Sequence, residues 1–91
     1  MKQPQILIID DDENLRHMLS VMLGKQGYQT DTAAGGAEAL VRLERQVYDY
    51  ILCDIRMPGM DGRSFLQQAI SRGVTAPIIM MTAYGTVDTA V

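Results

Sequence analysis

The segment Ile51–Gly62 most constrains the fold, because a short apolar run within it stops abruptly at an aspartate, Asp54. A Pro-Gly turn and an Asp-Gly step follow within eight residues. Apolar runs of this length with turn signals at their end are typical of buried strands rather than of helices. Asp54 is therefore predicted to lie at the carboxyl end of a strand, which is where open α/β sheets bind their ligands.

Two further apolar runs end in polar residues in the same way. Ile6–Ile9 leads into three consecutive aspartates, and Ile78–Met81 leads into Thr82. The first of these runs shows no alternation of polar and apolar residues, which favours a strand covered on both faces. If the three strands are parallel neighbours, their carboxyl ends converge, and we expect their polar residues to lie together.

Helical segments are predicted between the strands. The expected strands are Gln5–Ile9, Tyr28–Ala33, Tyr48–Ile55 and Pro77–Thr82. Three apolar stripes recur at helical spacing; they are Leu15, Met18, Leu19, Met22 and Leu23, then Ala37, Leu40, Leu43 and Val47, then Phe65, Leu66, Ala69 and Ile70. Alternating strands and helices predict right-handed crossovers and a parallel sheet, and hence an α/β fold.

Some residues also indicate where the helices begin and end. Asp12 is a suitable cap for a first helix that begins near Glu13, and Gly27 follows the expected end of that helix. The third helix is expected to end near Gly73. Gly85 and Thr86 are predicted to open a fourth helix, of which only Val87–Val91 is present.

Size and composition exclude several classes of protein. A chain of 91 residues corresponds to one domain, and a net charge of −3 without a basic patch argues against nucleic-acid binding. No signal peptide and no apolar stretch of membrane-spanning length is recognisable, so a cytoplasmic location is expected. The single cysteine, Cys53, lies inside an apolar run and is interpreted as a buried structural thiol.

Three aspartates at the converging strand ends predict a cation site. Asp10, Asp11 and Asp54 would repel one another strongly unless a cation compensates their charge or a pKa rises. Oxygen ligands suit Mg²⁺, with Mn²⁺ as a substitute. We assign Asp11 and Asp54 as direct ligands, the backbone carbonyl of Arg56 as a third, and Asp10 as a partner through water. The alternative is that Asp10–Asp12 merely cap the first helix, which suits Asp12 but leaves Asp54 unexplained.

An aspartate beside a divalent cation is also a candidate nucleophile toward phosphorus. Asp54 could form an aspartyl phosphate while the ion neutralises charge on the phosphoryl oxygens. The hydroxyl of Thr82 and the amide of Ala83 are candidate donors to those oxygens, because both follow the neighbouring apolar strand.

Three motifs, taken together and in this order, resemble the receiver domain of bacterial two-component response regulators. They are Ile8-Ile9-Asp10-Asp11-Asp12-Glu13, the run Asp54-Ile55-Arg56-Met57-Pro58-Gly59-Met60-Asp61-Gly62, and Met81-Thr82-Ala83. The resemblance implies a flavodoxin-like, doubly wound parallel sheet in strand order 2-1-3-4, and phosphotransfer from a sensor histidine kinase with Mg²⁺. It also implies that Asp54 is the phosphoacceptor, that Asp10 and Asp11 are the acidic pair, and that Thr82 is the switch hydroxyl. The sequences of the second motif and of Tyr84–Val91 are most similar to those of receivers of the nitrogen-regulation class of transcriptional activators. Such receivers relay the signal to an output domain.

The chain departs from this family pattern at its end. Receivers have a fifth strand and helix, a lysine at the end of that strand and an aromatic switch residue within it, whereas the only lysines here are Lys2 and Lys25. We therefore expect residues 1–91 to be a receiver domain that lacks the end of its fourth helix and its fifth strand and helix. Phosphorylation of these residues alone is expected to be slow or undetectable. The exposed edge of Pro77–Thr82 is expected to pair with a second copy, giving a homo-oligomer.

Other functions are weighed against the receiver. A scaffold or dimerisation fragment that is not phosphorylated would explain the absent lysine. A haloacid-dehalogenase-type phosphatase would need a second aspartate two residues after Asp54, where Arg56 stands, and Gly35-Gly36 does not make a phosphate-binding loop. His17 is interpreted as an ordinary surface or boundary residue. The chain is thus expected to be a signalling domain that accepts phosphate, rather than an enzyme.

Overall fold

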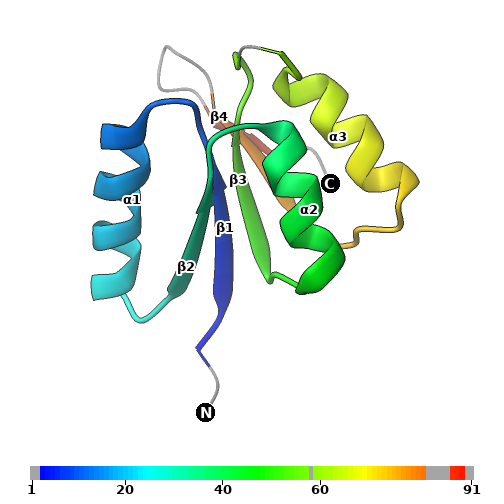
Figure 1. Ribbon diagram of the computed structural model, residues 1–91. Coiled ribbons are helices and arrows are strands. Elements are labelled where there is room, and N and C mark those ends of the chain that lie inside the picture. Colours follow the sequence, from blue (N-terminus) through cyan, green and yellow to red (C-terminus); the bar gives the residue numbers. More distant parts are fainter. Residues whose placement is uncertain (1–2, 58, 82–86, 90–91) are drawn as a thin grey trace.

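The chain forms a single sheet with helices on both of its faces (Figure 1). The computed structural model describes residues 3–57, 59–81 and 87–89. In chain order the elements are β1 (Gln5–Ile9), α1 (Glu13–Lys25), β2 (Gln29–Ala33), α2 (Gly36–Arg45), β3 (Tyr50–Asp54), α3 (Gly62–Ser71), β4 (Ile78–Met81) and β5 (Val87–Thr89).

The sheet confirms the predicted parallel arrangement. Its strand order is β2-β1-β3-β4-β5, and β1 pairs in parallel with both β2 and β3, as β3 does with β4. The register brings the strand ends level, since Ile9 is paired with Cys53, and Asp54 with Met81. The residues that follow β1 and those that end β3 therefore meet at one edge of the sheet.

The core lies between the sheet and the helices α2 and α3, which cover one face, while α1 covers the other (Figure 1). Strands β1 and β3 are central. Ile6–Ile9 of β1 are buried on both faces, as a continuous apolar run predicts, whereas in β3 Ile51 and Cys53 are buried and Leu52 only partly. The largest fully buried side chains are Phe65, Leu7, Ile8, Ile9, Ile51, Ile78 and Cys53. The interpretation of Cys53 as a buried structural thiol is thus confirmed.

The segment after Gly85 differs from the prediction. Val87–Thr89 forms the short strand β5, antiparallel to β4, with Met81 paired to Val87 and Ile79 to Thr89. The predicted start of a fourth helix is wrong at these residues. Because an unpaired strand edge leaves backbone N–H and C=O groups without partners, pairing with β5 satisfies groups that a helix would leave open. The predicted open edge of the fourth strand is therefore also wrong, and with it the argument for a homo-oligomer formed through that edge.

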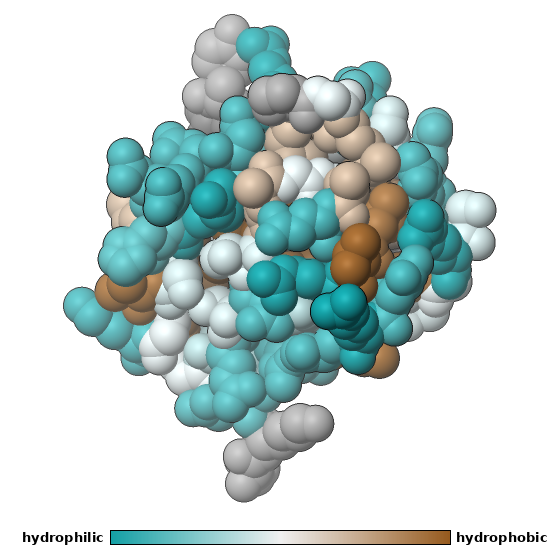
Figure 2. All heavy atoms as spheres, in the orientation of Figure 1, coloured by the Kyte–Doolittle hydropathy of each residue, from teal (hydrophilic) through white to brown (hydrophobic). Residues whose placement is uncertain are grey.

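The helical stripes are buried less completely than predicted. Met18 and Met22 of α1 are about half exposed, at 50% and 54%, and Ile70 of α3 is 53% exposed. Val47 lies beyond the end of α2 and is 88% exposed. Ala37, on α2, is exposed as well, and Ala39 takes its place in the core. Figure 2 shows that the surface seen in this orientation is mostly hydrophilic, with separate small apolar groups on the side of α1 and on the side of α2 and α3. Among the residues that the structure describes, no helix is long and apolar enough to cross a membrane.

Tyr48 joins the start of β3 to the edge strand β2. Its side chain is only 3% exposed, and its hydroxyl donates a hydrogen bond of 2.6 Å to Oδ2 of Asp31. Burial raises the pKa of Tyr48 to about 12, helped by Asp31 and opposed by the charge of Arg42. The neutral phenol is therefore the form that the fold favours.

We expect Tyr48→Phe to lower the free energy of unfolding by about 1–2 kcal/mol at pH 8, because it leaves the Asp31 carboxylate without this donor. Since the pKa of Tyr48 is higher in the folded chain than in the unfolded one, its contribution is complete below pH ~10 and is lost as the pH rises toward about 12. Urea unfolding of both chains across that pH range measures the effect. Tyr50→Phe is the control, since Tyr50 is 42% exposed. An equal alkaline loss in wild type and Tyr48→Phe would contradict the assignment.

Candidate functional site

Three carboxylates meet at the carboxyl edge of the sheet, as predicted. One oxygen each of Asp10, Asp11 and Asp54 lies within 4.8 Å of the other two. Asp10 and Asp11 directly follow β1, and Asp54 is the last residue of β3, so the pairing of β1 with β3 creates the cluster. Asp10 is buried, Asp54 is half-buried and Asp11 is exposed.

Asp10 is the carboxylate that the fold holds most tightly. It is 3% exposed, its Oδ1 accepts a hydrogen bond of 2.9 Å from the N–H of Asp12, and its own N–H donates to the carbonyl of Ala33. Burial raises the pKa of Asp10, and the nearby charges of Asp54 and Asp11 add to this, while the bond from Asp12 opposes it. The site thus disfavours the ionised form of Asp10 unless a positive charge compensates it.

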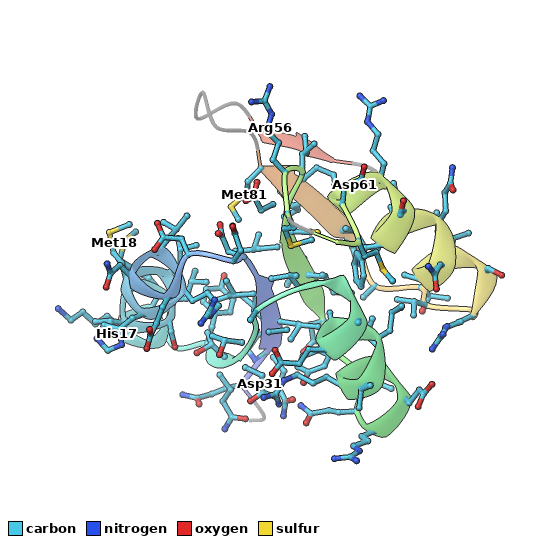
Figure 3. The ribbon with its side chains drawn as sticks, turned by 45° about the horizontal axis from the view of Figure 1, so that its top comes forward. His17, Met18, Asp31, Arg56, Asp61 and Met81 are labelled. Atoms are coloured by element: carbon cyan, nitrogen blue, oxygen red, sulfur yellow. The ribbon has the colours of Figure 1, made fainter. Side chains whose placement is uncertain are left out.

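Asp54 is oriented by the backbone that follows it. The N–H of Arg56 donates a hydrogen bond of 3.1 Å to Oδ1 of Asp54. The side chain of Arg56 is exposed and points away from the sheet (Figure 3). Arg56 therefore contacts Asp54 through its backbone N–H group, and the role of its carbonyl as a ligand stays a prediction.

The segment between β3 and α3 is held against the carboxyl end of β3. Asp61 caps α3, and its Oδ1 accepts a hydrogen bond of 2.8 Å from the N–H of Ser64, which lowers the pKa of Asp61. Figure 3 shows Asp61 at the start of this helix. Gly62 donates its N–H to the carbonyl of Ile55 at 2.9 Å, and a Cβ on Gly62 would stand 2.6 Å from the carbonyl oxygen of Asp54. Only a glycine allows the helix to approach the end of β3 this closely.

Arg16, on α1, is a neighbour of the site that the sequence interpretation missed. Its Nη1 donates a hydrogen bond of 2.7 Å to the carbonyl of Asp10. A signal was present, because a cation in the first turn of a helix opposes the helix dipole and is unfavourable unless something holds it there. By contrast, His17 is exposed and lies on the outer side of the same helix, which confirms its interpretation as a surface residue (Figure 3).

Two of the predicted site residues cannot be placed in this geometry. Thr82 and Ala83 lie outside the described residues, immediately after Met81 in the sequence. Met81 itself is paired with Asp54, and its carbonyl accepts the N–H of Ile55 at 3.0 Å.

The donor set fits a small divalent cation. With a metal–oxygen distance of about 2.1 Å, two ligands on opposite sides of a Mg²⁺ ion stand about 4.2 Å apart, and Mg²⁺ usually keeps several waters. The three carboxylate oxygens, all within 4.8 Å of one another, are close enough to surround one such ion. Burial is the main cause of the raised pKa of Asp10, but the charges of Asp54 and Asp11 add to it, and a cation would offset that part.

Comparison with known proteins gives a consistent result. Residues 6–91 match the family model described as response regulator receiver domain. The chain is 45% identical over 87 residues to the regulatory protein AtoC of Escherichia coli, covering 96% of this chain and 19% of that protein. It is 40% identical over 91 residues to the DNA-binding transcriptional regulator NtrC of Escherichia coli, covering all of this chain and again 19% of the relative.

Solved structures of other proteins also resemble this fold closely. The chemotaxis protein CheY4 of Vibrio cholerae matches with a TM-score of 0.88 and 32% identity, over 93% of this chain and 72% of that one. The response regulator TrrA of Thermotoga maritima, solved in complex with Mg²⁺-BeF, matches with a TM-score of 0.84 and 38% identity, over 90% of this chain and 71% of that one.

Proposed function

The chain belongs to the family of response regulator receiver domains, and on this premise we propose that Asp54 accepts a phosphoryl group from a sensor histidine kinase. The observation that carries the proposal is the convergence of Asp54 with Asp10 and Asp11 at the carboxyl edge of the sheet. A half-buried carboxylate at the end of a central strand is accessible to a phosphodonor, yet it is held by its own backbone.

The transfer itself needs only one nucleophile from this chain. An oxygen of Asp54 attacks phosphorus, a new P–O bond forms, and the P–N bond to the kinase histidine breaks. The electron pair of that bond leaves with the imidazole nitrogen, which takes up a proton. The N–H of Arg56 holds Oδ1 of Asp54 and so fixes the direction of the carboxylate for this attack.

A divalent cation would be held by Asp11 and Asp54 directly, with the carbonyl of Arg56 as a further ligand and Asp10 as a partner through water. When bound, it would neutralise charge on the phosphoryl oxygens. We propose Mg²⁺, with Mn²⁺ as a substitute, and the Mg²⁺-BeF complex of TrrA supports this choice. From the family resemblance, Thr82 and Ala83 are proposed to donate hydrogen bonds to the phosphoryl group.

The chain spans about a fifth of the length of the curated relatives that it matches, 19% for both AtoC and NtrC. We propose that it acts as the receiver part of a transcriptional regulator of this kind. In that setting phosphorylation of Asp54 would be relayed to an output domain, and the receiver would assist its own phosphotransfer and dephosphorylation.

The cation site is tested by exchanging one negative charge at a time. Asp11→Asn is expected to weaken Mg²⁺ binding at least about tenfold, because even outer-shell partners of a metal contribute that much. Asp12→Asn is the matched control. It removes the same charge from the next residue but keeps the helix cap that Asp12 makes with Asn14 and Leu15, since asparagine caps as well as aspartate. Isothermal titration calorimetry with MgCl₂ measures both, and equal affinity in Asp11→Asn and wild type would exclude Asp11 as a ligand.

A further inference from the structure

Arg16 connects the first helix to the backbone of the acidic cluster. Its Nη1 donates a hydrogen bond of 2.7 Å to the carbonyl of Asp10, across six residues of sequence. Its backbone N–H donates to the carbonyl of Asp12 at 3.0 Å. The backbone bond is the first i to i−4 bond of α1, so the specific contact of Arg16 with the segment Asp10–Asp12 is made by its side chain.

The position of this guanidinium is costly. It lies in the first turn of α1, where the helix dipole disfavours a positive charge. The side chain is also half-buried, so it gives up part of its hydration. An exposed arginine in the first turn would avoid the second cost. The hydrogen bond of 2.7 Å to the carbonyl of Asp10 offsets part of this cost.

The bond acts on the direction of Asp11. The carbonyl of Asp10 belongs to the same planar peptide unit as the N–H of Asp11, so fixing that oxygen fixes the plane from which Asp11 projects. The neighbouring peptide units are held as well, because the N–H of Asp10 donates to the carbonyl of Ala33 and the N–H of Asp12 donates to Oδ1 of Asp10. Arg16 adds a restraint at the peptide that leads directly to the exposed carboxylate.

We propose that Arg16 is a positioning residue for the cation site, and that it holds the peptide between Asp10 and Asp11 so that the Asp11 carboxylate faces Asp54. This rests on the proposed function, because it takes Asp11 as a ligand of the cation. Arg16 does not itself touch the cation or the phosphoryl group.

A second physical effect of Arg16 has the opposite sign, and this makes the proposal testable. A fixed positive charge near the cluster repels a second cation. If charge were the main effect, a neutral side chain at position 16 would tighten Mg²⁺ binding. If positioning is the main effect, the same change weakens it.

The experiment is a calorimetric titration of Mg²⁺ into wild type, Arg16→Met, Arg16→Lys and Arg45→Met. Arg16→Met removes both charge and donor while keeping an unbranched apolar stem, and we expect its affinity to fall about tenfold, the lower end of the effect of outer-shell partners. Arg16→Lys keeps the charge and a donor, and we expect it to recover affinity to within about threefold of wild type. Arg45→Met, an exposed arginine in the last turn of α2, is the control for the loss of one positive charge.

The Mg²⁺ affinity of the folded variants distinguishes a positioning role of Arg16 from an effect on stability alone. All titrations are made at a temperature at which urea unfolding in EDTA shows each variant to be fully folded, so a purely structural role of Arg16 would leave the dissociation constant unchanged. If Arg16→Met does not fold, Arg16→Gln takes its place, since the glutamine side chain is neutral and two atoms shorter than that of arginine. Affinity equal to or tighter than wild type in the neutral variant would overturn the proposal, as would an affinity of Arg16→Lys as weak as that of the neutral variant. Absence of Mg²⁺ binding in wild type would instead overturn the proposed cation site itself.

Discussion

The Asp54→Asn variant is expected to incorporate no phosphoryl group from acetyl phosphate and Mg²⁺ under conditions in which the wild-type chain is labelled. The amide oxygen can still accept the hydrogen bond from the N–H of Arg56, so the segment after β3 should keep its geometry. What is lost is the anionic oxygen, and with it the nucleophile. The incubation extends over hours, so that slow incorporation is also detected.

Intact mass spectrometry of the two chains over this time course gives the result. Asp12→Asn is again the control, because it removes one neighbouring negative charge while leaving Asp54 intact. It should be labelled at a rate close to that of wild type. Labelling of Asp54→Asn at the wild-type rate would show that another residue is the acceptor.

The second large effect is expected at Gly62, where α3 begins. A Cβ at this position would stand 2.6 Å from the carbonyl oxygen of Asp54, 2.7 Å from Cε of Met80 and 2.8 Å from Cα of Ile55. Met80 can move, but the other two atoms belong to the backbone of the site segment. We expect Gly62→Ala to lower the free energy of unfolding by about 3 kcal/mol, the upper end of the usual cost of overpacking.

Gly24→Ala provides the comparison for this change. Gly24 lies inside α1, and a Cβ there would meet nothing within 4 Å. The same substitution should therefore stabilise the chain by about 0.5–1 kcal/mol, because alanine has the higher helix propensity. Urea unfolding of both variants decides the matter. A Gly62→Ala chain as stable as wild type would mean that α3 can shift away from Asp54 at little cost, and that the site is less rigid than its geometry indicates.

Much of this site could be predicted from sequence because its information is local. Asp10, Asp11 and Asp54 each follow a continuous apolar run, and such runs separated by helical patterns leave few topologies other than a parallel sheet. Once the strands are parallel and adjacent, the aspartates at their ends must meet. The cap at Asp12 and the end of α1 before Gly27, which has a φ of +93°, could also be predicted, because these signals are local in the sequence.

What could not be predicted depends on contacts between distant segments. Val87–Thr89 carries no periodic signal, and its pairing with β4 depends on an edge that exists only in the folded sheet. Val47 continues the helical spacing of α2, but the helix ends at Arg45, so spacing alone misplaced it. The contact of Arg16 with Asp10 depends on the reach and direction of a long side chain, which the position of a residue on a helix does not reveal.

The location of the phosphoryl group decides whether Asp54 is the acceptor. The wild-type chain is treated with acetyl phosphate and Mg²⁺, cleaved with a protease at low pH, and mapped by tandem mass spectrometry. We expect one phosphoryl group per chain, in the peptide that contains Asp54, and none when Mg²⁺ is replaced by EDTA. A phosphoryl group on His17, or on the peptide that contains Asp10 and Asp11, would contradict it.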